Sequence, residues 1–317
     1  MDLWFDLGLP LRKGNMSIPR RDFFKLTALG SATLLAGAAE ADDDPEPLDF
    51  DKAYGVLVDT VACIGCRKCE WACNDFNALP TQELAAFEDK AVFRTHRRPT
   101  SAAYTVVNEF AGDAATGKKY TLKVQCMHCN EPACASSCLV GALQKHKEGP
   151  VVYDAWKCIG CRYCMVACPF QIPAYEYHNA LDPQVRKCTF CASRVIDEGR
   201  KPACVEICPC EALVFGTRSE LLDLADSRIK TSPGRYVDHV YGETEVGGTS
   251  WMYLAGVDFA ATELPRLSEV PPSHQTEPIQ HGIFKSFVPP LALYGLLGLV
   301  MHSLRERESD RDGADHE

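Results

Sequence analysis

Apolar residues in the central part of the chain come in short runs separated by polar and glycine-containing stretches. Such runs, of three to five residues each, predict short β-strands; they are Tyr54–Val58, Tyr104–Val107, Tyr120–Val124, Val151–Tyr153, Ala174–Tyr177 and Leu213–Phe215. Between them we expect irregular loops that lead into short helices. The pattern predicts an α+β fold made of many short elements.

Two further segments predict regular structure after the last of these runs. Ser219–Ile229 has the apolar spacing of a surface helix, with Ser219 as its N-cap. Tyr236–Phe259 predicts two strands around a turn at Gly247 and Gly248.

The N-terminal segment predicts an export signal. Arg20 and Arg21 are followed by Phe24, Lys25 and then the uncharged residues 26–39, a pattern typical of a twin-arginine (Tat) signal peptide. A short surface helix with two arginines is the alternative. We assign residues 1–41 to the signal, with Met16 as an alternative start, and the acidic residues 42–52 to a solvated linker.

The C-terminal segment predicts a membrane anchor. Residues 287–303 carry no formal charge and are followed by Arg305 and Arg307, which suits the cytoplasmic end of a spanning helix in an exported protein. A buried helix docked on the body is the alternative. Residues 261–286 contain several prolines and predict a tether, while residues 304–317 form a polar tail. The predicted location is therefore the periplasmic side of the cytoplasmic membrane.

Composition narrows the possible functions. The 317 residues could form one or two domains, and a net charge of -10 argues against a nucleic acid partner. Seventeen cysteines are too many for ordinary core residues, so most must be disulfides or metal ligands.

Sixteen of these cysteines fall into four quartets. Cys63–Cys73 and Cys158–Cys168 both have the spacing C-x2-C-x2-C-x3-C of bacterial ferredoxins, and residues 59–73 match residues 154–168 at nine of fifteen positions. The second quartet widens the middle gap to four residues and the fourth widens it to twelve; these quartets are Cys126, Cys129, Cys134, Cys138 and Cys188, Cys191, Cys204, Cys208. The sequence predicts a duplicated bacterial-ferredoxin-like domain over residues 53–260 with four cluster-binding motifs.

The spacing suits a cubane of iron and sulfur. Three closely spaced thiolates can hold three irons, and Gly65 and Gly160 let backbone N–H groups approach the sulfurs. The fourth cysteine, displaced onto a following helix, serves a neighbouring cluster. Four motifs then hold four 4Fe-4S clusters and leave Cys210 over, which we interpret as a buried spare thiol.

Other interpretations of the cysteines fit less well. Zinc ribbons use two separated pairs and give no role to the third closely spaced cysteine. An odd count and tight triplets argue against a disulfide framework. A module whose metal sites only stabilise its fold remains an alternative. We find no nucleotide-binding or hydrolase motif, so we expect no catalysis by the chain alone. Arg67 and Arg162 are candidates for raising the reduction potentials of the clusters. His128 is expected to be a polar loop residue.

Over roughly Asp51–Phe259 the chain resembles the four-cluster iron-sulfur subunits of the DMSO reductase and formate dehydrogenase class. The resemblance is carried by residues 187–194 (KCTFCASR), 199–204 (GRKPAC) and 208–216 (CPCEALVFG). With the signal peptide, the anchor and residues 241–249 (YGETEVGGT), the chain is most similar to the membrane-anchored subunits of hydrogenase-2-type NiFe hydrogenases.

The resemblance implies a ligand scheme in which the first motif pairs with the fourth and the second with the third. The four implied ligand sets are Cys63, Cys66, Cys69 and Cys208; Cys73, Cys188, Cys191 and Cys204; Cys126, Cys129, Cys134 and Cys168; and Cys138, Cys158, Cys161 and Cys164.

The resemblance also implies the function and the partners. Electrons would pass through four 4Fe-4S clusters between a periplasmic catalytic partner, formed by the small and large subunits of a NiFe hydrogenase, and an integral membrane quinone-reactive subunit. The Tat translocase would be a partner during export. A β subunit of a formate dehydrogenase, or of another molybdopterin oxidoreductase, is the alternative.

Overall fold

The computed structural model describes residues 48–112, 117, 119–277, 279 and 294–302. The predicted signal peptide, most of the acidic linker and the polar tail lie outside these residues. The predicted anchor, 287–303, is described only over residues 294–302, which are helical. Within the described ranges, no helix has the length and apolar character needed to cross a bilayer.

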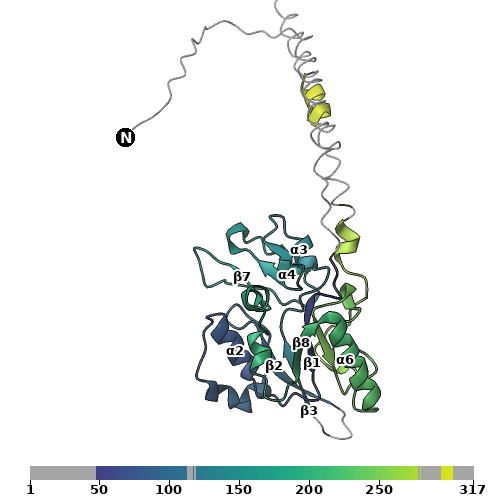
Figure 1. The fold of residues 1–317 in the computed structure, drawn as a ribbon. Helices are drawn as coiled ribbons and strands as arrows, with labels where there is room; N and C mark the ends of the chain where they lie inside the picture. Colours follow the sequence, from purple (N-terminus) through teal and green to yellow (C-terminus); the bar gives the residue numbers. More distant parts are fainter. Residues whose placement is uncertain (1–47, 113–116, 118, 278, 280–293, 303–317) are drawn as a thin grey trace, which may run out of the picture. The chain divides into compact units, whose positions relative to one another are not determined.

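A three-stranded sheet joins segments that are far apart in the sequence (Figure 1). Its central strand, β1 (Tyr54–Asp59), pairs antiparallel with β8 (Leu213–Thr217), and Val58 lies opposite Leu213. On its other side β1 pairs in parallel with β9 (Trp251–Leu254), with Val56 opposite Trp251. The sheet therefore holds the start of the body against its end.

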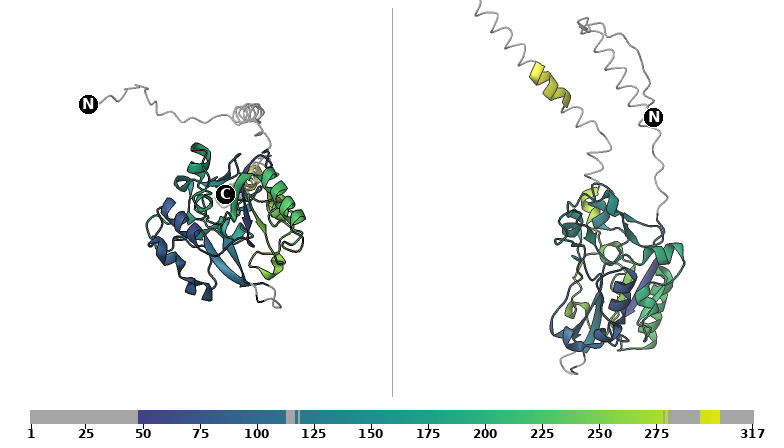
Figure 2. Two further views of the ribbon diagram at one scale, coloured as in Figure 1. Left: turned by 60° about the horizontal axis from the view of Figure 1, so that its bottom comes forward. Right: turned by 90° about the vertical axis from the view of Figure 1, so that its left-hand side faces the viewer.

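Alternate side chains of this sheet point to two different apolar layers, because successive residues of a strand face opposite sides. Leu57, Met252 and Leu254 pack against helix α6 (Arg218–Thr231), which covers one face of the sheet (Figures 1 and 2). The strand residues that face the opposite side of the sheet, among them Val56, Val58, Trp251 and Tyr253, belong to the main core. Several cysteines are buried in the same core.

Helix α6 confirms the predicted helix but begins earlier. Thr217, and not Ser219, is the N-cap: its hydroxyl accepts a hydrogen bond from the N–H of Glu220, whose carboxylate accepts one from the N–H of Thr217. This reciprocal capping box satisfies two backbone donors at the start of the helix.

Three two-stranded sheets and four short helices complete the cysteine-bearing part of the body. The sheets are β2 (Val106–Ala111) with β3 (Lys119–Val124), β4 (Leu143–Lys145) with β5 (Val151–Tyr153), and β6 (Ala174–Tyr175) with β7 (Val185–Arg186). The helices are α2 (Lys68–Phe76), α3 (Ala133–Ser136), α4 (Tyr163–Ala167) and α5 (Ala203–Glu206). The expected mixture of short helices and strands is confirmed, although β2 begins two residues later than predicted.

Six short helical turns and the helical residues 273–277 and 294–302 complete the described regular structure. Five of the turns are 3-10 helices, at Leu84–Glu88, Lys90–Arg94, Ala155–Lys157, Glu245–Gly247 and Phe259–Ala261, and Ser193–Asp197 forms one π-helical turn.

The internal repeat is visible in the pairing of the strands. Strand β1 precedes the first cysteine motif and pairs with β8, which follows the fourth. Strand β5 precedes the third motif and pairs with β4, which follows the second. The two strand pairs thus bring the first motif to the fourth and the second motif to the third.

One of the two strands expected in Tyr236–Phe259 is absent from the structure. Only β9 forms, and Tyr241 makes a single bridge to Tyr253. The buried carboxylate of Glu245 accepts hydrogen bonds from the N–H of Gly242 (2.7 Å), so the chain folds back locally and cannot extend as a strand.

The body continues beyond residue 260, into the predicted tether. The N–H of Val246 donates to the carbonyl of Ser268 (2.8 Å), and that of Gly247 donates to the carbonyl of Glu269 (2.7 Å). Leu264 is buried in the main core. The first part of the tether is therefore a packed segment, because its backbone donors and acceptors and its apolar side chains find partners on the body.

Leu221 tests the packing of α6. It is 2% exposed and lies in the layer between α6 and the sheet. Leu221→Ala should lower the free energy of unfolding by about 2–5 kcal/mol, because it leaves a cavity in that layer. A lower midpoint in anaerobic thermal unfolding would show this loss. Ser227→Ala, at an exposed position of the same helix, should cause no loss, and equal midpoints for the two variants would contradict this account.

Candidate metal centre

The first and third cysteine loops have the same backbone conformation. Gly65 and Gly160 have φ values of 66° and 69°, and the two arginines that follow, Arg67 and Arg162, have φ values of 60° and 62° before α2 and α4 begin. A Cβ at Gly160 would lie 2.8 Å from the hydroxyl of Tyr175, so glycine is required both for φ and for space. The N–H of Gly160 donates to the sulfur of Cys158 (3.4 Å).

The second and fourth cysteine loops also match each other. His128 and Phe190 lie between the first two cysteines of their quartets, with φ values of 49° and 57°, and their rings meet edge to face with centroids 5.1 Å apart. In both quartets a Pro-Ala-Cys segment then starts a short helix, α3 or α5, which carries the third cysteine. The duplication is therefore present in the local geometry of all four loops. The fourth cysteine of each quartet was expected on the following helix, but only Cys73 is helical; Cys138, Cys168 and Cys208 follow helices that are too short to include them.

The structure gathers the sixteen predicted cysteines into four groups, which we call sites 1 to 4. Site 1 comprises Cys63, Cys66, Cys69 and Cys208, which line one apolar-walled cavity. Site 4 comprises Cys138, Cys158, Cys161 and Cys164, which line a second cavity. Site 2 comprises Cys73, Cys188, Cys191 and Cys204, and site 3 comprises Cys126, Cys129, Cys134 and Cys168. Within each of these two groups the sulfurs are close enough for the charge of one thiolate to raise the pKa of another cysteine.

The four sites follow one another in numerical order. The charge on Cys204 of site 2 acts on Cys69 of site 1. Cys126 of site 3 acts on Cys188 of site 2, and Cys164 of site 4 acts on Cys134 of site 3. Helix α2 carries ligands of sites 1 and 2 one turn apart, as Cys69 and Cys73.

The two ends of this row are nearest to solvent. All four cysteines of site 2 are buried, and two of those of site 3 are buried. In site 1 none of the four is fully buried, and Cys161 of site 4 is exposed. The middle sites are thus shielded while the terminal sites are accessible from the surface.

The thiol groups suit a cluster that binds four thiolates. Burial, and then the charges of neighbouring cysteines, raise the pKa of Cys191 to about 12, and burial raises the pKa of Cys164 to about 11. Free thiols would stay protonated here, and iron would displace the protons. Among the described residues, no three His, Cys, Asp or Glu side chains are placed to hold one single metal ion. At sites 1 and 4 the sulfurs instead surround a cavity, the arrangement that a cubane with an iron at each of four corners requires. Ligation by all sixteen residues stays a prediction.

The loop of site 1 is fixed by a buried ionic network. Glu70 is 3% exposed and accepts hydrogen bonds from Arg67, Arg97 and the N–H of Val107. Burial alone would raise the pKa of this carboxyl group, but the hydrogen bonds and charges of the two arginines outweigh it and lower the pKa. Arg67 therefore shares one carboxylate with Arg97, and the network keeps a net charge of +1. The expectation that Arg67 raises a cluster potential stays a prediction.

His128 differs from the polar loop residue that we expected. Its ring is fully buried, and its Nδ1 accepts a hydrogen bond from the N–H of Val151 (2.8 Å). Burial, together with the charge of Lys187, holds the pKa of His128 well below its usual range. The ring is thus a neutral packing element that ties the second loop to β5.

A buried cation beside sites 1 and 2 is absent from the residues that the sequence singled out. Lys123 of β3 is 2% exposed, lines the cavity of site 1, donates to the side-chain oxygen of Gln125 (2.9 Å) and lies over the ring of Trp251 (4.4 Å). Among the described residues its ammonium group forms no salt bridge with a carboxylate. Burial would lower the pKa of Lys123, but the cysteines of sites 1 and 2 raise it. A lysine inside an apolar strand was the available sequence signal.

Lys123→Met should make sites 1 and 2 harder to reduce. Removing a buried positive charge costs about 1–2 kcal/mol of attraction for an added electron, which lowers a one-electron potential by roughly 40–90 mV. Potentiometric EPR titration measures the shift. Lys119→Met is the matched control on the same strand, because its ammonium is exposed and pairs with Glu109; unchanged potentials in Lys123→Met would show that this charge does not act on the clusters.

Comparison with known proteins agrees with this geometry. Residues 118–218 match the family model of the 4Fe-4S dicluster domain. A protein of Nitratidesulfovibrio vulgaris is 52% identical over 248 residues, covering 77% of this chain but only 66% of that relative, just under two thirds of its length. The hydrogenase-2 operon protein HybA of Escherichia coli O157:H7 is 34% identical over 336 residues, covering 94% of this chain and 99% of HybA.

A further relative is the iron-sulfur subunit of the nitrate-inducible formate dehydrogenase of Escherichia coli K12, which is 31% identical and covers 95% of this chain and 99% of the relative. These relatives carry electrons for oxidoreductase complexes and are not the catalytic subunits. The predicted 4Fe-4S clusters and the predicted resemblance are confirmed. The chain therefore belongs to the family of 4Fe-4S electron-transfer subunits that includes HybA and the formate dehydrogenase iron-sulfur subunits.

Proposed function

We propose that this chain passes electrons through four 4Fe-4S clusters, at sites 1 to 4, between a periplasmic catalytic partner and a quinone-reactive subunit in the membrane. The observation that carries the proposal is the row of four cysteine groups with both ends near the surface. A bound cluster supplies reversible one-electron chemistry. The chain's own residues hold the row in order and keep water from its middle sites.

The catalytic partner in this proposal is a NiFe hydrogenase. Support comes from the end-to-end similarity to HybA, whose name refers to hydrogenase-2. A formate dehydrogenase is the second candidate, because iron-sulfur subunits of formate dehydrogenases are 30–32% identical to this chain, for example 31% over 95% of its length. The predicted twin-arginine signal and C-terminal anchor support a periplasmic location in either case.

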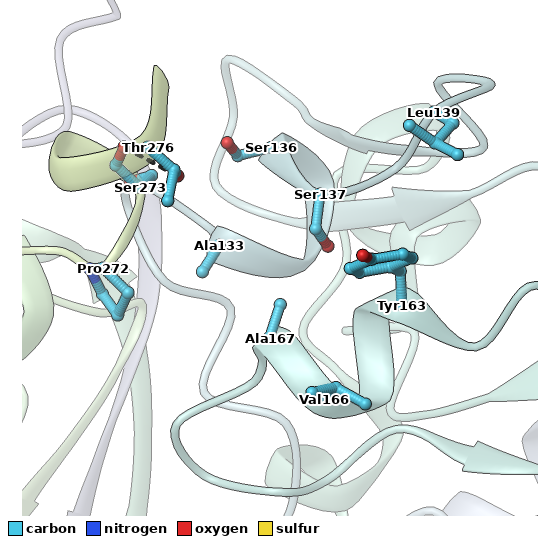
Figure 3. Close-up of a pocket in the computed structure, with 10 residues that line it drawn as sticks. All are labelled: Ala133, Ser136, Ser137, Leu139, Tyr163, Val166, Ala167, Pro272, Ser273 and Thr276. Carbon is cyan, nitrogen blue, oxygen red and sulfur yellow. Dashed lines mark hydrogen bonds between the residues drawn. The ribbon is translucent and has the colours of Figure 1, made fainter. Parts of the chain in front are cut away.

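The membrane partner in this proposal lies at site 4. A groove beside this site is lined by side chains of α3 and α4 and by Pro272, Ser273 and Thr276, which precede the predicted anchor in the sequence (Figure 3). Apolar side chains around the site are strongly exposed, a feature typical of protein interaction surfaces; they include Leu139, Trp156, Ile159, Tyr163 and Val166. A membrane subunit that contacts these exposed side chains would lie next to site 4.

Anaerobic purification tests the electron-carrier function. The protein should contain roughly sixteen iron atoms per chain, four at each of four sites, and should give EPR signals that appear and disappear reversibly in a potentiometric titration. Stoichiometric zinc without iron would contradict the proposal. Iron that does not change oxidation state reversibly would favour a module whose metal sites only stabilise its fold.

Affinity purification from membranes of the native host distinguishes the partners. We expect the small and large subunits of a NiFe hydrogenase and an integral membrane subunit in the same complex by mass spectrometry. A molybdopterin-containing catalytic subunit in their place would transfer the assignment to the formate dehydrogenase type.

Cys138→Ser tests the exchange of ligands between motifs. Cys138 belongs to the second motif in sequence but lines the cavity of site 4 with Cys158, Cys161 and Cys164. The variant should damage the cluster of site 4 and leave that of site 3, which EPR of the reduced protein can resolve. Damage confined to the cluster held by Cys126, Cys129 and Cys134 would refute the scheme.

A further inference from the structure

Site 1 contains five cysteines and not four. Cys210, which was expected to be a buried spare thiol, is only half-buried and lines the same cavity as Cys63, Cys66, Cys69 and Cys208. Its sulfur lies 3.9 Å from that of Cys208, a van der Waals contact in which either thiol can be the hydrogen-bond donor. Two sulfurs this close compete for one ligand position.

The internal repeat shows what is unusual about Cys210. Residues 138–143 (CLVGAL) of site 4 correspond to residues 208–213 (CPCEAL) of site 1. In both segments the chain turns through a residue with positive φ, Gly141 at 61° and Glu211 at 50°. Val140 lines the cavity of site 4 in the place where Cys210 lines that of site 1. The position two residues after the fourth cysteine therefore faces the cavity in both halves, and only in site 1 does it carry a thiol.

We propose that Cys208 and Cys210 are an exchangeable pair of ligands for the fourth iron of site 1. This inference rests on the proposed function, since it assumes a cluster at site 1. In the exchange the Cys210 sulfur forms a bond to iron as the bond from iron to the Cys208 sulfur breaks, and the proton of the Cys210 thiol passes to Cys208. No electron is gained or lost.

Cys208 is the resident ligand of the pair. Backbone N–H groups of Leu213, Cys210 and Ala212 point to its sulfur, as the equivalent N–H of Ala142 does to Cys138 (3.2 Å). N–H donors stabilise a thiolate ligand. Cys210 is the reserve, placed near the surface end of the row where loss of a ligand is most exposed to oxidants.

Single and double substitutions test the pair by EPR and iron analysis. Cys208→Ala should keep a 4Fe-4S cluster at site 1, with an altered EPR spectrum, because Cys210 takes its place. The double variant Cys208→Ala/Cys210→Val should lose one iron and show the signal of an oxidised 3Fe-4S centre. Cys138→Ala is the matched control. Because site 4 has Val140 in place of a second thiol, this single substitution should already give a 3Fe-4S centre. The proposal falls if Cys208→Ala already resembles the double variant.

Introducing a cysteine at residue 140 of site 4 tests whether a thiol at the position equivalent to Cys210 can serve as a cluster ligand. Cys138→Ala/Val140→Cys should recover the 4Fe-4S cluster that Cys138→Ala loses, because it creates the same thiol position as Cys210. An added cysteine that leaves the 3Fe-4S signal unchanged would overturn the geometric argument. The signals of the other three sites report whether each variant is folded.

Cys210→Val keeps the resident ligand and avoids the risk of misfolding. Ferricyanide removes one electron from a cubane, which then releases one Fe²⁺ and leaves a 3Fe-4S centre. This conversion should be several-fold faster in Cys210→Val than in the unmodified protein, and equal rates would contradict a reserve role. Absence of iron from the unmodified protein would instead refute the proposed function, so the two failures are distinguishable.

Discussion

Sulfur atoms from distant parts of the chain have to meet in small, buried, apolar-walled cavities, and most of the fold follows from this constraint. Cys208 reaches the loop of Cys63 because β8 pairs with β1, and Cys138 reaches the loop of Cys158 because β4 pairs with β5. Each strand pair joins the segment before one motif to the segment after another. The short helices add little apolar surface of their own; they place ligands one turn apart so that neighbouring sites share an element.

Charge sets the second constraint. Thiolates gathered in a buried space repel one another, and burial raises their pKa values further. Iron offsets most of this repulsion, and buried Lys123 adds a positive charge that no carboxylate of the described residues neutralises. Arg67 is also buried, but it shares the carboxylate of Glu70 with Arg97 and fixes the loop of site 1 through that ionic network. Two cations next to the same site thus have different physical roles.

The described body has different surroundings at its two ends. Site 4 lies among exposed apolar side chains beside a groove to which the segment at Ser273 contributes. Site 1 lies under the loop that Arg67 closes through its hydrogen bonds to the carbonyls of Phe87 and Asp89. A carrier with two distinct ends can face two different partners, which is what passing electrons in one direction requires.

Cysteine spacing alone determined the chemistry of this protein, because only a cubane uses three closely spaced thiolates and a displaced fourth. The short apolar runs also determined most of the strands, since alternation along a strand is a local property. The spacing did not show which motif completes which site; the resemblance implied it, and the tertiary structure brings the motifs together. For the first and fourth motifs this depends on the pairing of β1 with β8, two segments so far apart in the sequence that they leave no local signal. The same holds for the surroundings of each polar residue: whether a lysine or an arginine next to a motif is exposed, paired or buried alone depends on segments far away, as Lys123, Arg67 and Cys210 each show.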